Sequence, residues 1–157
     1  MDTSRVSLGE MIAAAGGLVL LVCMFLPWFG GEWIGRGAPV PVPTTTGWEA
    51  YGGVLDILIV LLAAVPIGIA AARANHSRLR LPLEPWAAVT LAGAMLIVLV
   101  AIRLIDPPDV INVAIPGLEI DTSRKFAAFV AAAAAAAVTA GGYLQSVRRV
   151  GFEPTSP

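Results

Sequence analysis

Apolar residues occur in four long runs, separated by polar segments rich in proline, glycine and arginine. The first run, 11–29, contains no charged residue at all. An α-helix rises 1.5 Å per residue, so about 20 apolar residues cross a hydrocarbon core of about 30 Å. The pattern therefore predicts an all-α membrane protein, a four-transmembrane-helix bundle with helices over about 8–29, 47–72, 85–105 and 123–146.

Short polar motifs mark where two of these helices begin. Ser7 and Glu10 form an S-x-x-E pattern, and Thr46 and Glu49 form T-x-x-E. In such a capping box the hydroxyl accepts from one helical amide while the carboxylate accepts from another. Pro85 fits the first turn of the third helix, where its missing N–H would have no partner.

The segments after the first and third helices are expected to form a small external cap. Pro39, Pro41 and Pro43 alternate with apolar residues, which favours an extended strand at a sheet edge. Apolar alternation over 113–120 surrounds Pro116-Gly117, which predicts a hairpin. Because an isolated hairpin is marginal in water, we expect the two loops, 1 and 3, to share one sheet.

Composition supports lipid as the main solvent and excludes several functional classes. The chain has 57% hydrophobic and 13% charged residues, against about 25% charged in soluble domains. A net charge of −1 argues against nucleic-acid binding. With Cys23 as the one cysteine and His76 as the one histidine, neither an internal disulfide nor a histidine or cysteine metal site is predicted, and no cofactor is expected.

The distribution of arginine and lysine predicts the orientation. Trp28 and Phe29 are too bulky for signal-peptide cleavage, so the first helix is expected to be retained. Short loops rich in Arg and Lys stay in the cytoplasm. One side carries Arg5, Arg73, Arg78, Arg80, Arg148 and Arg149, and the other Arg36, Arg103, Arg124 and Lys125. This predicts a multi-pass plasma-membrane protein with both termini cytoplasmic, a single domain over 1–150 and a disordered tail over 151–157.

Asp56 is the sharpest candidate for chemistry, because it interrupts the apolar run of the second helix. It is expected about 15 Å from the Thr46 cap, where a lone charge costs about 2.5–3.5 kcal/mol on insertion scales. Arg103, near the end of the third helix, is its expected partner. The functional interpretation is a proton-coupled or ligand-binding carboxylate. The alternative is a structural polar pair that joins two helices, and that alternative is favoured.

Four aromatic residues are expected at the outer membrane surface. Trp28, Trp33, Trp48 and Tyr51 all flank the predicted outer ends of helices. Amphipathic rings are enriched at the headgroup layer, so an interfacial belt explains them without a ligand.

Several motifs together resemble a known group. They are FLPWF at 25–29, TGWEAY at 46–51 followed by LDILIVL, RLIDPP at 103–108, and GGYL at 141–144. The chain resembles small uncharacterised four-span integral membrane proteins of high-GC, actinobacterial-type bacteria. The resemblance implies a fold and a membrane location, and it implies no activity or catalytic residue. The outline is also similar to claudin-like proteins, but their cysteine pair is absent, so no junction role is inferred.

The function expected from these patterns is that of a non-enzymatic structural or interaction subunit. No nucleophile–base pair, paired catalytic acids or phosphate-binding glycine loop occurs in the sequence. The alternative is a small oligomeric transporter or channel with Asp56 as its intramembrane acid. The expected partner is the lipid bilayer; a membrane-protein partner and a homo-oligomer both stay open.

Overall fold

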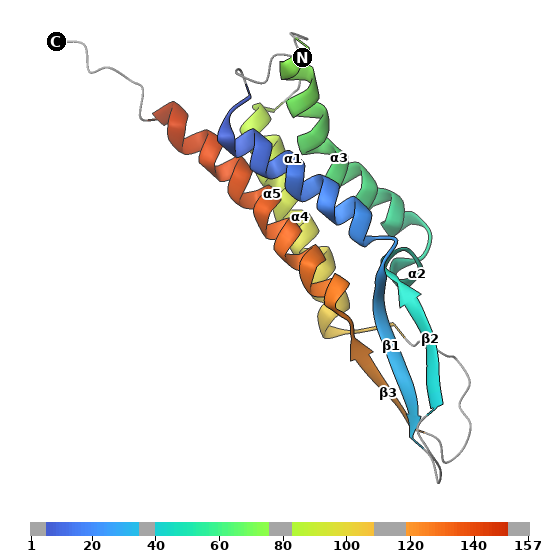
Figure 1. Ribbon diagram of the computed structural model, residues 1–157. Coiled ribbons are helices and arrows are strands. Elements are labelled where there is room, and N and C mark those ends of the chain that lie inside the picture. The colour runs from blue at the N-terminus through green and yellow to red at the C-terminus, as the bar shows by residue number, and fades with distance from the viewer. Residues whose placement is uncertain (1–5, 35–39, 76–82, 109–118, 151–157) are drawn as a thin grey trace, which may run out of the picture.

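The protein folds into long helices that stand beside one another, with a small antiparallel sheet at one end (Figure 1). The computed structural model describes residues 6–34, 40–75, 83–108 and 119–150. The helices are α1 (Leu8–Cys23), α2 (Gly47–Tyr51), α3 (Val54–Ala74), α4 (Pro85–Ile105) and α5 (Phe126–Val150). The strands are β1 (Pro27–Ile34), β2 (Val40–Thr46) and β3 (Glu119–Arg124).

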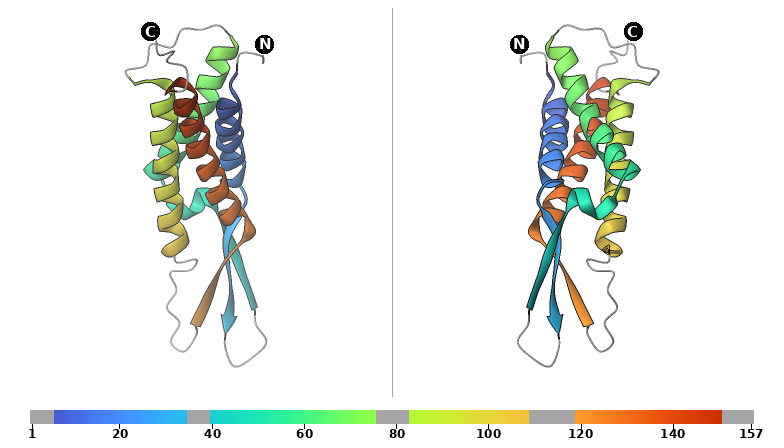
Figure 2. Two further views of the ribbon diagram at one scale, coloured as in Figure 1. Left: turned by 90° about the vertical axis from the view of Figure 1, so that its left-hand side faces the viewer. Right: turned by 90° about the vertical axis from the view of Figure 1, so that its right-hand side faces the viewer.

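The four long helices contact one another pairwise. α5 lies along both α1 and α4, while α3 packs on α1 and α4. The sheet extends away from one end of these helices, which we call the sheet end; the opposite end, where α1 begins and α5 ends, is the far end (Figure 2). Large buried side chains such as Leu20, Ile59 and Leu96 fill the space between the helices.

Within the described ranges, three helices are long and apolar enough to cross a membrane: α3, α4 and the Phe126–Val147 part of α5. α1 is also apolar, but it has 16 residues and is shorter than these three.

Small residues allow α5 to approach its neighbours closely. A Cβ atom added at Gly141 would lie 2.5 Å from the Gly9 carbonyl oxygen and 2.7 Å from the Ala13 amide nitrogen. One added at Gly93 of α4 would lie 2.6 Å from the Thr139 nitrogen. Since no side chain fits at these crossings, glycine is required for the backbones to approach, as expected where packing rather than apolar burial holds helices together.

The first helix ends at Cys23 rather than at residue 29, and the chain enters β1 at Pro27. Its last carbonyl groups find partners outside the helix. The Trp48 amide donates to the Met24 oxygen at 2.8 Å, and the Trp28 indole donates to the Cys23 oxygen at 2.7 Å. Helix ends need such partners because their last four carbonyls have none within the helix.

The helix expected over 47–72 is divided in two, because Gly52 and Gly53 both have positive φ (67° and 70°). Glycine adopts this region without steric cost, so the pair separates α2 from α3 and redirects the chain. The Thr46–Glu49 capping box therefore starts a helix of five residues.

The cap is a three-stranded sheet in the order β2-β1-β3. Both neighbours run antiparallel to β1, with Gly31 opposite Val42 of β2 and Thr122 of β3. The proline-bearing strand β2 lies at an edge, whereas the central strand β1 comes from residues predicted as the end of the first helix and the loop after it. The hairpin expected about Pro116-Gly117 and the tail 151–157 lie outside the described residues.

Candidate functional site

Asp56 lies in the first turn of α3 at the sheet end, and not deep in a continuous helix as expected. The Gly52-Gly53 break causes this difference, because it places the start of α3 only two residues before Asp56. The carboxylate is 2% exposed and lies beside the Gly53 amide, in the first helical turn, where an acidic residue is favourable. Its Oδ1 oxygen is buried and has no hydrogen-bond partner in the part of the chain that the structure describes.

Arg103 approaches Asp56 but does not form an ion pair with it within the part of the chain that the structure describes. Its guanidinium instead lies over the Tyr51 ring, 5.5 Å from the ring centroid, in a cation–π arrangement. Tyr51 is buried, and its hydroxyl donates to the Leu99 carbonyl of α4 at 3.1 Å. Burial raises the pKa of the Tyr51 phenol, while the positive charge of Arg103 opposes that rise.

The predicted aromatic belt divides into two kinds of residue. Trp28 and Tyr51 are buried and pack edge to face at 5.8 Å, so they belong to the core and not to the surface. Trp48 is 42% exposed and stacks on the exposed Phe25 ring at 6.1 Å. Trp33 lies in β1 opposite Val40 and Ile120.

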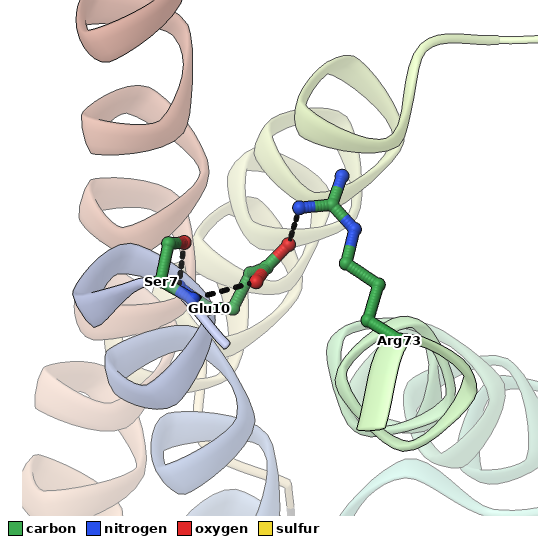
Figure 3. A network of polar contacts seen from close by, with 3 residues as sticks. All are labelled: Ser7, Glu10 and Arg73. Carbon is green, nitrogen blue, oxygen red and sulfur yellow. Dashed lines mark hydrogen bonds and ion pairs between the residues drawn. The ribbon is translucent and has the colours of Figure 1, made fainter. Parts of the chain in front are cut away.

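A second polar cluster, at the far end, was not identified from the sequence. Glu10 of α1 is buried, and one of its oxygens accepts from the Ser7 amide at 2.9 Å to complete the capping box. Its other oxygen forms an ion pair with Arg73, in the last turn of α3 (Figure 3). The sequence showed the cap and a basic loop separately; the pairing depends on α1 and α3 lying side by side, which no local pattern encodes.

Gln145 lies near this cluster on α5. It is 8% exposed, and neither of its side-chain amide atoms has a hydrogen-bond partner among the described residues. Its Cγ lies 3.2 Å from the position of a Cβ added to Gly9, next to Glu10 in sequence. The far end thus holds an ion pair with a buried carboxylate and, next to it, a buried amide.

Chemical groups for metal or cofactor binding are not gathered in the described ranges. No group of three or more His, Cys, Asp or Glu side chains there could hold a metal ion. Cys23 is buried as a free thiol. A groove of about 390 Å³ between α1 and α5 is lined by alanine, glycine, valine and isoleucine, so it offers no polar group for catalysis.

Comparisons with known proteins provide no relative. No family model, curated protein or solved structure matches the chain.

Proposed function

We propose that this is an integral membrane protein whose four long helices all cross the bilayer, and that it acts as a structural or interaction subunit without enzymatic activity. The observation that carries the proposal is an inverted distribution of side chains. Glu10, Asp56 and Gln145 are buried, whereas large apolar side chains are exposed on every long helix. Exposed examples are Leu18, Leu61, Leu91, Val98 and Phe129. Such a surface suits hydrocarbon, and contiguous apolar patches of this extent are rare on soluble monomers.

The ends of α1 support a fourth span despite its length. Its 16 residues rise about 24 Å, somewhat less than a hydrocarbon core of about 30 Å. At the sheet end the exposed apolar residues Phe25 and Leu26 continue this length. Exposed Val54, Ile105 and Phe126 lie at the same end of α3, α4 and α5, so each long helix has apolar residues at this end.

The sheet is proposed to lie outside a bacterial plasma membrane, with both termini in the cytoplasm. The arginine distribution supports this orientation, and the resemblance to four-span proteins of high-GC bacteria supports the membrane location. The apolar core between Asp56 at one end and Glu10 at the other supports a structural role, because residues such as Ile59, Leu96 and Val138 fill it.

Site-directed cysteine labelling in a Cys23→Ala background tests the spans. A membrane-impermeant maleimide applied to intact cells is expected to label Asp106→Cys at the sheet end. Val6→Cys and Asn75→Cys, at the far end, are expected to react only after permeabilisation. Labelling of Val6→Cys but not Asn75→Cys in intact cells would show that α1 does not cross.

The interaction role is tested by purification from native membranes in mild detergents followed by mass spectrometry. A stoichiometric membrane-protein partner or a stable homo-oligomer is expected, and a monomer in every mild detergent would contradict the subunit role.

The transporter alternative depends on one observation, the buried Asp56 oxygen without a partner. If Asp56 is a coupling acid, Asp56→Asn abolishes a proton-dependent flux into proteoliposomes without changing the amount of folded protein. A structural acid instead lowers thermal stability when replaced, with no flux to lose.

A further inference from the structure

Two opposite charges and an aromatic ring meet at the sheet end without forming an ion pair. Asp56 and Arg103 interact electrostatically with each other and with the Tyr51 hydroxyl. Asp56 leaves its Oδ1 atom buried and unpartnered, while the Arg103 guanidinium lies over the ring. Buried polar atoms are nearly always hydrogen-bonded. A buried carboxylate oxygen without a partner, near an arginine, therefore indicates a ligand that donates a hydrogen bond to it.

We propose that Asp56, Arg103 and Tyr51 form a binding site for a zwitterion that carries a primary ammonium and a phosphate or carboxylate. The ammonium donates to Asp56 Oδ1, and the anionic group accepts from the Arg103 guanidinium, whose planar fork suits phosphate and carboxylate geometry. This inference rests on the membrane placement proposed above.

The position of the site favours a lipid headgroup as the source of this zwitterion. Asp56 lies in the first turn of α3 and Arg103 in the last turn of α4. The exposed Phe25–Trp48 stack, typical of the headgroup layer, is at the same end of the helices. A phosphoethanolamine headgroup carries both required charges at this depth.

Access to the carboxylate leads through the glycine junction. Asp56 is 2% exposed, so the ammonium reaches Oδ1 only when the groups that cover the carboxylate move aside. No atom of a described residue lies within 4 Å of a Cβ added at Gly52 or Gly53, so none of these residues packs against that side of the junction. The headgroup can therefore enter without displacing a packed side chain.

The test compares the thermal unfolding midpoint of the full chain in nanodiscs of three compositions. These are phosphatidylglycerol alone, phosphatidylglycerol with phosphatidylethanolamine, and phosphatidylglycerol with phosphatidylcholine. A quaternary ammonium has no N–H to donate. We therefore expect phosphatidylethanolamine, and not phosphatidylcholine, to raise the midpoint by at least about 3 °C. Equal midpoints in the two mixtures would overturn the proposal with the wild-type protein alone.

Variants test whether the rise in the unfolding midpoint depends on Asp56 and Arg103. Asp56→Asn and Arg103→Gln are expected to lose the rise, while Asp106→Asn, an exposed acid one turn from Arg103, is expected to keep it. A rise that persists in Asp56→Asn would exclude this carboxylate as the ammonium site.

A last arm distinguishes the two sources of the ligand. Free phosphoethanolamine that raises the midpoint of detergent-solubilised protein indicates a soluble zwitterion, whereas an effect confined to the lipid indicates a bound headgroup. Failure of the chain to enter nanodiscs at all would instead contradict the membrane placement.

Discussion

Trp28 connects the end of α1 to the start of the sheet through one buried indole. Its Nε1 donates to the Cys23 carbonyl, and its ring packs against Tyr51. A Cβ added at Gly47 would lie 2.6 Å from the same nitrogen, so the adjacent α2 must begin with glycine. Trp28 was expected at the lipid surface, but its side chain is part of the buried core.

Trp28→Phe is expected to lower the free energy of unfolding by about 0.5–1.5 kcal/mol, because the Cys23 oxygen loses its side-chain donor and keeps only the Leu26 amide. Thermal or denaturant unfolding in detergent measures this loss. Trp48→Phe is the matched control, since Trp48 is partly exposed and its indole N–H has no bond to a described residue. Equal losses for the two variants would contradict the structural role of Trp28.

Glu49 provides a pH dependence outside the spanning helices. The Thr46 amide and hydroxyl donate to its carboxylate at 2.8 and 3.0 Å, and these bonds lower the pKa of Glu49 below its usual 4.5. A carboxyl group whose pKa is lower in the folded state stabilises that state above the unfolded pKa. That contribution is lost as the pH falls through the folded pKa.

Glu49→Gln is therefore expected to lower the thermal midpoint at pH 7, and its difference from the wild-type protein is expected to shrink as the pH falls below 4.5. The midpoint of both proteins across this range is the measurement. A difference that stays constant with pH would show that the charge of Glu49 does not stabilise the Thr46–Glu49 capping box of α2.

At the scale of elements, helices approach each other closely where glycine, which has no side chain, lies at the crossing. Gly141 on α5 contacts the α1 backbone, whereas a Cβ added at Gly68 on α3 would have no atom of a described residue within 4 Å. Gly141→Ala is expected to cost about 1–3 kcal/mol through overpacking. Gly68→Ala is expected to be neutral or to stabilise by about 0.4–1 kcal/mol. Unfolding of both variants in the same detergent provides the comparison, and similar effects of both would contradict the close α1–α5 crossing.

The Glu10–Arg73 ion pair joins α1 to α3 at the far end. A double-mutant cycle with Glu10→Gln and Arg73→Gln is expected to give a coupling free energy of about 0.5–1 kcal/mol. The value is at the low end because the Arg73 side chain is 38% exposed and solvent screens the pair. Additive effects of the two substitutions would show that the pair does not stabilise the contact between the helices.

Local patterns in the sequence predicted some elements well and missed those that depend on distant partners. The Ser7–Glu10 and Thr46–Glu49 boxes form as their spacing indicates, and the helix expected over 85–105 spans Pro85–Ile105. β1 was missed because an apolar stretch after a helix looks like more helix, and its partner β3 lies about 90 residues away along the chain. A sheet partner at that distance leaves no periodic signal beside the strand.

The expected Asp56–Arg103 contact failed for a similar reason. The sequence predicted one continuous helix over 47–72, but the Gly52-Gly53 pair breaks it through its positive φ values. That break moves Asp56 to a helix start beside the Gly53 amide, while the Arg103 guanidinium lies over the Tyr51 ring.

For the molecule as a whole, the decisive property is an apolar exterior. Leu61 is 61% exposed near the middle of α3. On a soluble protein, Leu61→Arg would change stability by about 0.5 kcal/mol or less. In a bilayer it is expected to cost about 2.5–3.5 kcal/mol and to reduce the amount of inserted protein.

The membrane-bound fraction and the thermal midpoint measure that effect. Thr44→Arg, at an exposed position of β2, is the control and is expected to change neither quantity. Normal insertion and stability of Leu61→Arg would contradict lipid contact at this face.

The connections between sheet and helices differ in length and stiffness. Lys125 alone separates β3 from α5, and three residues separate α1 from β1. α3 follows the sheet only through α2 and two glycines. The sheet is therefore connected to α1 and α5 by short segments, and to α3 by a junction at which glycine alone adopts the backbone angles without steric cost. Gly52→Ala or Gly53→Ala would thus strain the one connection between the sheet and α3, while leaving those to α1 and α5 unchanged.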